Sequence, residues 1–356
     1  MFLVHKIVFL LNFIFAAALA LAYMAPGTDP EAFWPFAFFG LAYPILLIIN
    51  VFFIIYWIAF KKLRFILSLG LIIFGWGHVN NIFQISSADI EKTDASIRVF
   101  TFNTKRMGTF DNKASSYPLV LPIIDSLKPE IICFQEFLGY YKPNDNSQKK
   151  LNKLGLKYQH FKITTKGWDT ADYGNIIASK YPILSKGEVP IITNGGNNCI
   201  YADIVKDGDT IRIYSLHLQS IGFQPQDYKF IQTLQDDTAA VDKSKNIISR
   251  LKNAFKMRAS QAKLVRAHID ACPYKVIVCG DFNDTPSSFA YHKIKGKLKD
   301  AFKESGSGIS RTYVGPFPSF RIDHILIDPA FDGFNYTTFS NLKSDHKMVM
   351  TDVMIR

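Results

Sequence analysis

Three long apolar segments fill the first 85 residues, and almost every charged residue lies after them. The segments cover residues 3–23, 36–60 and 63–85, and each is long enough for the roughly 20 residues that cross a bilayer as a helix. A cleaved signal peptide is the competing interpretation of the first segment, but two more segments follow it directly. The sequence therefore predicts a three-span membrane anchor over residues 1–85, with the lipid bilayer as its partner.

Loop charges predict the orientation of this anchor. Lys61, Lys62 and Arg64 lie between the second and third segments, whereas the first loop contains Asp29 and Glu31 and no basic residue. Because basic loops stay on the cytoplasmic side, we expect the chain to leave the third segment on the outer side. We predict an integral protein of the cytoplasmic (inner) membrane whose larger domain is extracytoplasmic or periplasmic. The segments contain no acidic residue, which argues against a transport function.

The chain after residue 85 is basic. Only four of the 41 Lys and Arg residues and two of the 30 Asp and Glu residues lie in the first 85, so the remainder carries a net charge of +9. Such a charge favours anionic partners, either phosphodiesters such as nucleic acid or an anionic membrane surface. Composition alone does not choose between these two, and no protein partner can be inferred.

The stretch VIVCGDFND, residues 276–284, is the first candidate for a site. Its β-branched start predicts a buried strand, and we expect Gly280 to end that strand by allowing a turn. Asp281 and Asn283 then lie at the carboxyl end of the strand, where ligands bind in layered α/β proteins. A carboxylate and an amide at this spacing suit the activation of a water that attacks phosphorus. An Asx turn that caps a core strand is an equal alternative for this stretch alone.

Other predicted strands also end in polar residues. The strand over residues 97–103 ends at Asn103, and the strand over residues 131–136 ends at Glu136. A glutamate that closes a buried strand is costly unless a cation meets it. Mg²⁺, which takes few carboxylates and keeps several waters, is the candidate cation, and a surface salt bridge is the alternative.

Two histidines and their neighbours complete the candidates. His217 lies near the end of the predicted strand 211–218, and Asp323 lies on the predicted strand 321–328. Asp345 and His346 come just before the last strand. A single histidine on a strand is more often structural than catalytic, so only the company of the other residues points to catalysis.

The order of elements predicts the fold class. Residues 86–96 are polar and are interpreted as a linker, and residues 97–356 alternate many strands with few helices. The longest helix, within residues 222–271, is amphipathic with a basic exterior, which covers a sheet or binds lipid or nucleic acid. We expect an α/β domain of two sheets packed face to face with helices outside.

The polar residues, taken in order, resemble the motifs of the endonuclease/exonuclease/phosphatase superfamily, which includes DNase I-like nucleases, neutral sphingomyelinases and inositol-polyphosphate phosphatases. The set consists of Asn103, Gln135-Glu136, His217, Gly280 to Asn283, Asp323 and Ser344 to His346. The resemblance covers residues 97–356 and implies a four-layer α/β sandwich of two mixed sheets flanked by helices.

The resemblance also implies a metal site. Glu136 matches the main Mg²⁺ ligand of the family, with Mn²⁺ as an alternative metal. Asp345 is similar to a carboxylate that assists metal binding, and Asn103 resembles the amide that supports both metal and phosphate.

The remaining roles implied by the resemblance concern water and phosphate. Asp281 matches the residue that polarises the attacking water, and Asn283 the residue that orients the nucleophile or phosphate. His346 resembles the histidine that binds the scissile phosphate, and Asp323 the carboxylate that fixes its orientation. His217 matches the histidine that acts on the leaving oxygen in the nuclease and sphingomyelinase branches.

Together these features predict a membrane-anchored, Mg²⁺-dependent phosphohydrolase. A phosphodiesterase that acts on nucleic acid or on a phospholipid headgroup fits best, because activated water, charge neutralisation and in-line geometry are what such hydrolysis requires. The alternatives are a phosphomonoesterase and a catalytically silent binding or scaffold module of the same fold.

Overall fold

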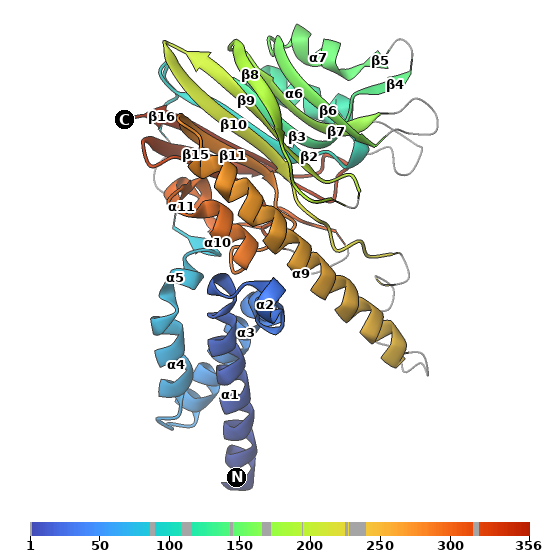
Figure 1. Ribbon diagram of the computed structural model, residues 1–356. Coiled ribbons are helices and arrows are strands. Elements are labelled where there is room, and N and C mark those ends of the chain that lie inside the picture. The colour runs from blue at the N-terminus through green and yellow to red at the C-terminus, as the bar shows by residue number, and fades with distance from the viewer. Residues whose placement is uncertain are drawn as a thin grey trace.

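The computed structural model describes residues 2–85, 90–107, 116–142, 145–165, 172–193, 195–224, 227, 240–315 and 320–356. Figure 1 shows an N-terminal bundle of helices (residues 2–82) on one side of a two-sheet domain (residues 97–356, the sheet domain). Residues 86–89 of the predicted linker lie outside the described residues.

The N-terminal bundle contains two helical segments that are long and apolar enough to cross a membrane. They cover Phe2–Gly27, which includes α1 (Phe2–Ala22) and η1 (Ala25–Gly27), and α3 (Pro35–Ala59). The four-residue α2 (Pro30–Phe33) lies between them.

The third predicted span is shorter than expected. Its helix α4 (Phe65–Phe74) has ten residues and is followed by the four-residue α5 (Trp76–Val79). Gly75 lies between the two helices, and the ring of Tyr23 approaches it so closely that a Cβ at this position would lie 2.2 Å from that ring. This helix is shorter than the predicted span over residues 63–85, and the three-span anchor stays a prediction.

Buried polar side chains nevertheless tie α4 to the two long helices. Asn12 of α1 donates a hydrogen bond to the Ser68 hydroxyl of α4 at 2.7 Å, and Ser68 donates to Asn50 of α3 at 2.8 Å. The Trp57 indole donates to the Asn12 side-chain oxygen at 2.9 Å. Such bonds between helices are specific because an unpaired polar group among apolar side chains is costly. The three helices therefore form one packed bundle.

Two six-stranded sheets form the body of the sheet domain. The first has the order β12 (Lys299–Asp300), β14 (Asp323–Ile327), β11 (Lys275–Asp281), β10 (Asp209–His217), β9 (Asn198–Lys206) and β8 (Ile183–Val189). The second has the order β15 (Phe331–Phe339), β16 (Met348–Ile355), β2 (Ile97–Asn103), β3 (Ile131–Leu138), β7 (Tyr173–Ser179) and β6 (Tyr158–Thr165). Both sheets are mixed, since β10 is parallel to β11 and β2 is parallel to β3.

The sheets pack face to face over an apolar core, to which Val99 and Cys133 contribute from one sheet and Ile213 and Ile277 from the other. Helices cover the outer faces. α6 (Tyr117–Leu127) and α7 (Ser147–Lys153) pack on the second sheet, and α9 (Ala240–Asp270) and α10 (Phe289–Lys295) pack on the first. The predicted four-layer α/β sandwich is confirmed.

One local prediction needs correction. β11 does not end at Gly280 but continues to Asp281, and a Cβ on Gly280 would lie 2.0 Å from the Leu216 carbonyl oxygen of β10. Glycine is needed here because the neighbouring strand approaches closely. The next helix, α10, begins at Phe289, because the Ser288 side chain accepts a hydrogen bond from the Tyr291 amide and caps the helix there.

The bundle also packs against the sheet domain directly. The short strand β1 (Phe83–Gln84) pairs with β13 (Gly308–Ile309), which connects the end of the bundle to the sheet domain. The buried guanidinium of Arg321 donates to the Asn81 carbonyl oxygen at 2.9 Å, and the Lys263 ammonium lies 2.5 Å from the Glu31 carboxylate. These contacts fix one orientation between the two parts.

Candidate active site

Strand register brings three of the predicted residues into one row. His217 of β10 lies opposite Asp281 of β11, and Asp281 lies opposite Asp323 of β14. Asn103, at the end of β2 in the other sheet, donates a hydrogen bond to Asp281 Oδ2 at 2.9 Å. The carboxyl ends of β2 and β11 therefore meet where the two sheets face each other.

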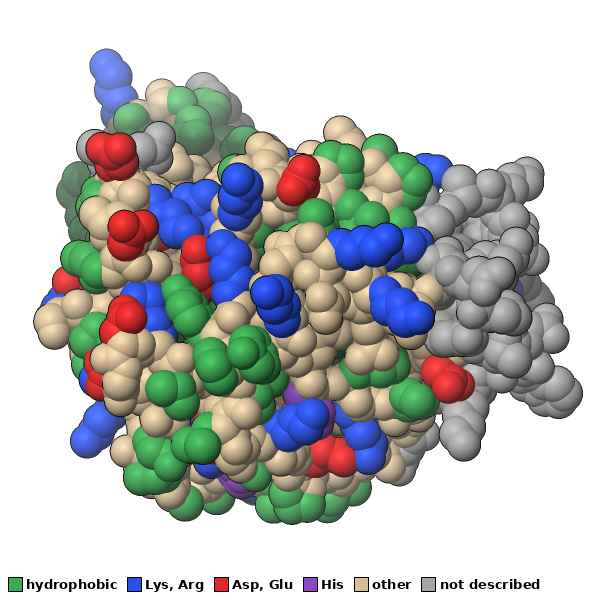
Figure 2. Space-filling view, turned by 90° about the horizontal axis from the view of Figure 1, so that it is seen from above, with side chains coloured by type: hydrophobic (Ala, Val, Ile, Leu, Met, Phe, Trp, Pro, Cys, Tyr) green, Lys and Arg blue, Asp and Glu red, His purple; other side chains and the backbone are tan. Residues whose placement is uncertain are grey.

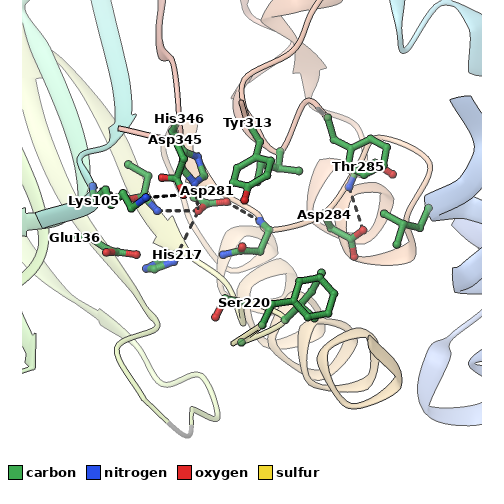
Figure 3. A pocket seen from close by; sticks show the side chains of 18 of the residues that line it. Lys105, Glu136, His217, Ser220, Asp281, Asp284, Thr285, Tyr313, Asp345 and His346 are labelled. Atoms are coloured by element: carbon green, nitrogen blue, oxygen red, sulfur yellow. Dashed lines mark hydrogen bonds and ion pairs between the residues drawn. The ribbon is translucent and has the colours of Figure 1, made fainter. Parts of the chain in front are cut away.

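Asp281 is the centre of this arrangement and is 1% exposed. The Asn283 backbone amide donates to its Oδ1 at 2.7 Å. The Nε2 atoms of His217 and His346 each lie 3.7 Å from its Oδ2 (Figure 3). Burial raises the pKa of Asp281 above its usual value, although the two histidines act in the opposite direction. A carboxylate with a raised pKa is a better proton acceptor, as a general base requires.

His346 forms a charged pair with Asp323. Its Nδ1 lies 2.9 Å from Asp323 Oδ2, and both side chains are buried. Burial alone would lower the pKa of His346, but the charges of Asp323 and then Asp281 outweigh it and raise that pKa to about 10. The imidazole is therefore protonated near neutral pH, and its Nε2 faces Asp281. Asp281, Asp323 and His346 are close enough together to hold a cation, but a protonated histidine cannot be a metal ligand.

Glu136 is the side chain that best fits a metal. It lies at a bulge between β3 and β7, and its φ of +48° is in the left-handed region that a glutamate rarely adopts. The Thr104 hydroxyl holds this backbone by donating to the Glu136 carbonyl oxygen at 2.9 Å. The structure gives the Glu136 carboxylate no hydrogen bond or ion pair with another described residue. An unpaired, half-buried carboxylate held in a strained turn fits a hard cation such as Mg²⁺.

Asp345 is the second predicted metal ligand, and it lies in the same cavity. The Lys105 ammonium is 3.2 Å from its carboxylate, so this group already has a cationic partner. The donor set of Glu136 and Asp345 consists of carboxylate oxygens, which suits Mg²⁺ or Mn²⁺ rather than softer metals.

The other two predicted residues lie at the same place. His217 is buried, and its Nδ1 has no hydrogen-bond partner among the described residues. Asn283 has a φ of +51°, and its side-chain nitrogen donates to the Leu218 carbonyl oxygen at 2.9 Å. This bond holds the turn after β11 against the end of β10, so that the Asn283 backbone remains directed at Asp281.

These groups line one cavity of about 450 Å³ (Figure 3). Its lining includes seven of the eight predicted site residues, namely Asn103, Glu136, His217, Asp281, Asn283, Asp345 and His346. Asp323 is not part of the lining, because it lies behind His346. The structure thus brings the whole predicted set together.

Sequence reasoning missed four residues that line or shape the cavity. Lys105 and Arg106 directly follow Asn103, and two cations after a strand end are a signal that could have found them. Tyr313 pairs with the His346 backbone as an isolated bridge, and its ring centroid is 5.4 Å from that of His346. Leu41 comes from α3 of the N-terminal bundle, and nothing in its sequence context predicts a place in the site.

The comparison with protein-family models decides the classification. Residues 101–346 match the model of the Endonuclease/Exonuclease/phosphatase family, and residues 5–82 match a domain of unknown function. The chain belongs to the endonuclease/exonuclease/phosphatase family. Enzymes of this family are metal-dependent hydrolases of phosphoesters, so this chain is a phosphoester hydrolase of that family. The resemblance inferred from the motifs is confirmed.

Solved structures share the fold of this endonuclease/exonuclease/phosphatase domain. A family protein from Beutenbergia cavernae is 16% identical with a TM-score of 0.52, and the match covers 73% of this chain and 72% of that chain. The human Nocturnin catalytic domain is 16% identical with a TM-score of 0.54, and the match covers 76% of this chain and 97% of that domain. A humanized D. rerio TDP2 is 14% identical with a TM-score of 0.50, and the match covers 73% of this chain and 99% of that chain. At these identities the likeness concerns the fold alone. No curated protein matches the chain.

Proposed function

We propose that this protein is a membrane-anchored, Mg²⁺-dependent phosphodiesterase whose catalytic domain lies on the extracytoplasmic side. The observation that carries the proposal is the position of Asp281. It is a buried carboxylate with a raised pKa, and two histidines lie 3.7 Å from the same oxygen atom.

The chemistry assigned to the residues follows from this position. Asp281 accepts a proton from the attacking water, and the amide of Asn103 holds its carboxylate in place. The His346 imidazolium binds a phosphoryl oxygen, and Asp323 keeps it charged and oriented. Glu136, with Asp345, would hold Mg²⁺, which when bound neutralises charge that develops on the phosphoryl oxygens.

His217 is the candidate proton donor for the leaving oxygen. Asp281 lies between two neighbours in the sheet, His217 on β10 and Asp323 on β14. The Nδ1 atom of His217 has no hydrogen-bond partner among the described residues. An ester whose leaving group is an alkoxide needs a proton donor of this kind. His346 meets the phosphoryl charge, which leaves His217 for the leaving oxygen.

Membrane anchoring is supported by the length and composition of the two long helical segments. Exposed apolar side chains cover α1 and α3, including Leu10, Ile14, Ile48 and Ile55, and such a surface is stable in lipid but not in water. The basic turn after α3 supports an outer position of the sheet domain, because basic loops stay on the cytoplasmic side. Helices α4 and α5 return the chain to that side although they are shorter than a full span.

Hydrolysis of bis(p-nitrophenyl) phosphate by the purified full chain in detergent tests the proposal. We expect turnover that requires Mg²⁺ and is lost in EDTA. Asp281→Asn should lower kcat by about 10³-fold or more, since it removes the base but keeps the shape. Asp242→Asn is the matched control, because Asp242 is exposed on α9 and does not line the cavity. Full activity of Asp281→Asn, or turnover that EDTA leaves unchanged, would contradict the proposal.

A further inference from the structure

The catalytic cavity extends to the N-terminal bundle. Besides the catalytic groups, its lining contains Leu41 of α3 together with apolar side chains of the loops, namely Ile221, Phe223, Phe320 and Ile322. The cavity therefore extends from Asp281 to α3, where Leu41 lines it. Figure 3 shows the faint blue ribbon of the bundle next to the end where Asp284 and Thr285 lie.

The first turns of α3 are covered by the sheet domain rather than open to lipid. A Cβ on Gly40 would lie 2.8 Å from the Ser287 carbonyl oxygen, and the Phe38 ring packs edge-on against Phe255 of α9 with centroids 5.2 Å apart. The exposed large apolar residues of α3 begin at Ile45, one turn after Leu41, and continue to Ile58.

The length of α3 agrees with this division. At 1.5 Å per residue, its 25 residues measure about 37 Å, which exceeds the roughly 30 Å of a bilayer core. The part of α3 from Ile45 to its end at Ala59, together with the turn from Leu41 to Pro44 before it, has a length close to the thickness of the core. Leu41 thus lies at the level where the helix leaves the lipid, and so does the end of the cavity that Leu41 lines.

Charge around this level favours an anionic headgroup. The amino-terminal half of α9 slants past the sheets to the side of the bundle (Figure 1) and carries Lys245 and Lys252, the latter 5.3 Å from the Trp34 ring. Ile248 on the same half is 45% exposed. A helix with basic and apolar side chains at this height is typical of one that lies at a membrane surface.

The face of the sheet domain away from the bundle carries side chains of both charges. Figure 2 views it from the side away from the bundle and shows Lys and Arg side chains scattered among acidic and apolar ones. The described side chains on that face form no continuous basic track such as a nucleic-acid strand would follow.

We propose that the substrate is a membrane phospholipid, whose phosphate enters the cavity from the adjacent leaflet while its acyl chains stay against α3 near Leu41 and Ile45. This inference rests on the proposed function and names its substrate class. Water attacks the phosphorus, one phosphorus–oxygen ester bond breaks, and the departing alcohol takes up a proton. Because the cavity lies at the lipid surface, the enzyme does not have to extract the acyl chains into water, which is unfavourable.

The experiment compares three substrates for the full chain reconstituted in vesicles of phosphatidylethanolamine and phosphatidylglycerol. The vesicle lipids themselves are followed by mass spectrometry of the released headgroup and lipid products. Bis(p-nitrophenyl) phosphate reports the catalytic centre without a membrane substrate, and plasmid DNA is the competing class. We expect lipid products to form with Mg²⁺ and DNA to remain intact.

The variant Leu41→Trp fills the end of the cavity next to α3 while it keeps α3 apolar. We expect the ratio of lipid turnover to bis(p-nitrophenyl) phosphate turnover to fall about tenfold. The control variant is Ile48→Trp. Ile48 lies two turns further along α3, is 55% exposed and faces the lipid, so this variant should leave the ratio unchanged. The soluble ester shows in the same samples that each variant has folded.

The outcomes separate the two proposals. Turnover of the soluble ester without lipid products, or faster cleavage of DNA than of lipid, overturns the lipid assignment and leaves the phosphodiesterase standing. An unchanged ratio in Leu41→Trp also overturns it. Failure to hydrolyse any of the three substrates overturns the proposed function and, with it, this inference.

Discussion

The two sides of strand β14 place a histidine in opposite electrostatic surroundings. On the cavity side, Asp323 of β14 pairs with His346 and, against the effect of burial, holds its pKa at about 10. On the rear side, the next residue, His324, accepts a hydrogen bond from Arg321 at 3.0 Å. Burial and then the charge of Arg321 lower the pKa of His324 to about 3.

The comparison shows that burial keeps a histidine neutral unless neighbouring carboxylates outweigh it. Both are buried, yet one is a cation available to phosphate and the other is a neutral hydrogen-bonding group. The rear side is built for stability. Arg321 pairs with Asp300 at 2.8 Å, and the Tyr291 hydroxyl donates to the same carboxylate. We therefore expect changes on the cavity side to affect catalysis and changes on the rear side to affect folding.

The largest expected effect is on the cavity side. Asp323→Asn removes the charge that keeps His346 protonated, and we expect kcat to fall about 10³-fold or more. Because the raised pKa of His346 gives stability below pH 6.5 that is lost as the pH rises through about 10, the variant should lose part of that stability at neutral pH.

Histidine NMR during a pH titration checks the cause, since the His346 pKa should drop toward its ordinary value in Asp323→Asn. An unchanged His346 pKa together with full activity would remove the distinction between the two sides. Asp332→Asn, at a half-buried position in β15, is the matched control for loss of a carboxylate.

Arg321→Leu should have the largest effect on the rear side. It leaves the buried Asp300 carboxylate unpaired, and breaking such a pair costs about 3–5 kcal/mol of folding free energy. Denaturant unfolding measures the loss, and the kcat of the folded fraction should change less than tenfold. Arg311→Leu, at an exposed position ten residues earlier, should be nearly neutral. Inactive Arg321→Leu protein with wild-type stability would reverse the assignment of the two sides.

The smallest expected effect concerns the pH dependence of stability. The pKa of His324 is about 3 in the folded protein, below its ordinary 6.5. The contribution of neutral His324 to the free energy of unfolding is therefore complete above pH 6.5 and is lost as the pH falls toward 3. The slope of this loss approaches 1.4 kcal/mol per pH unit. His324→Gln keeps groups that can bond Arg321 and the Asp284 carbonyl oxygen but does not titrate.

Melting temperatures between pH 7 and pH 4 should therefore fall less steeply in His324→Gln than in the wild type. His292, whose pKa burial lowers to about 4, contributes a similar slope to both proteins. Parallel curves for the two proteins would show that His324 is protonated in the folded state, against the contrast drawn between the two sides.

Strands with a regular apolar pattern were predictable from the sequence, and irregular strands were not. The strand over residues 97–103 has the predicted bounds. β9 was missed because Asp203 interrupts its apolar run, and only the Arg212 guanidinium on β10, 2.6 Å away, makes that carboxylate tolerable. β15 was missed because a bulge between Phe334 and Thr337 breaks its alternation.

The sequence by itself determined the chemical groups of the site and the division into an apolar and a charged part. Both depend on residues that are neighbours in the sequence, namely runs of apolar residues and the polar residues that end them. Only the tertiary structure decided that α3 reaches the cavity through Leu41, that Lys105 binds Asp345, and that His346 is charged while His324 is neutral. These features depend on distances and burial between segments far apart in the chain, which no local pattern encodes.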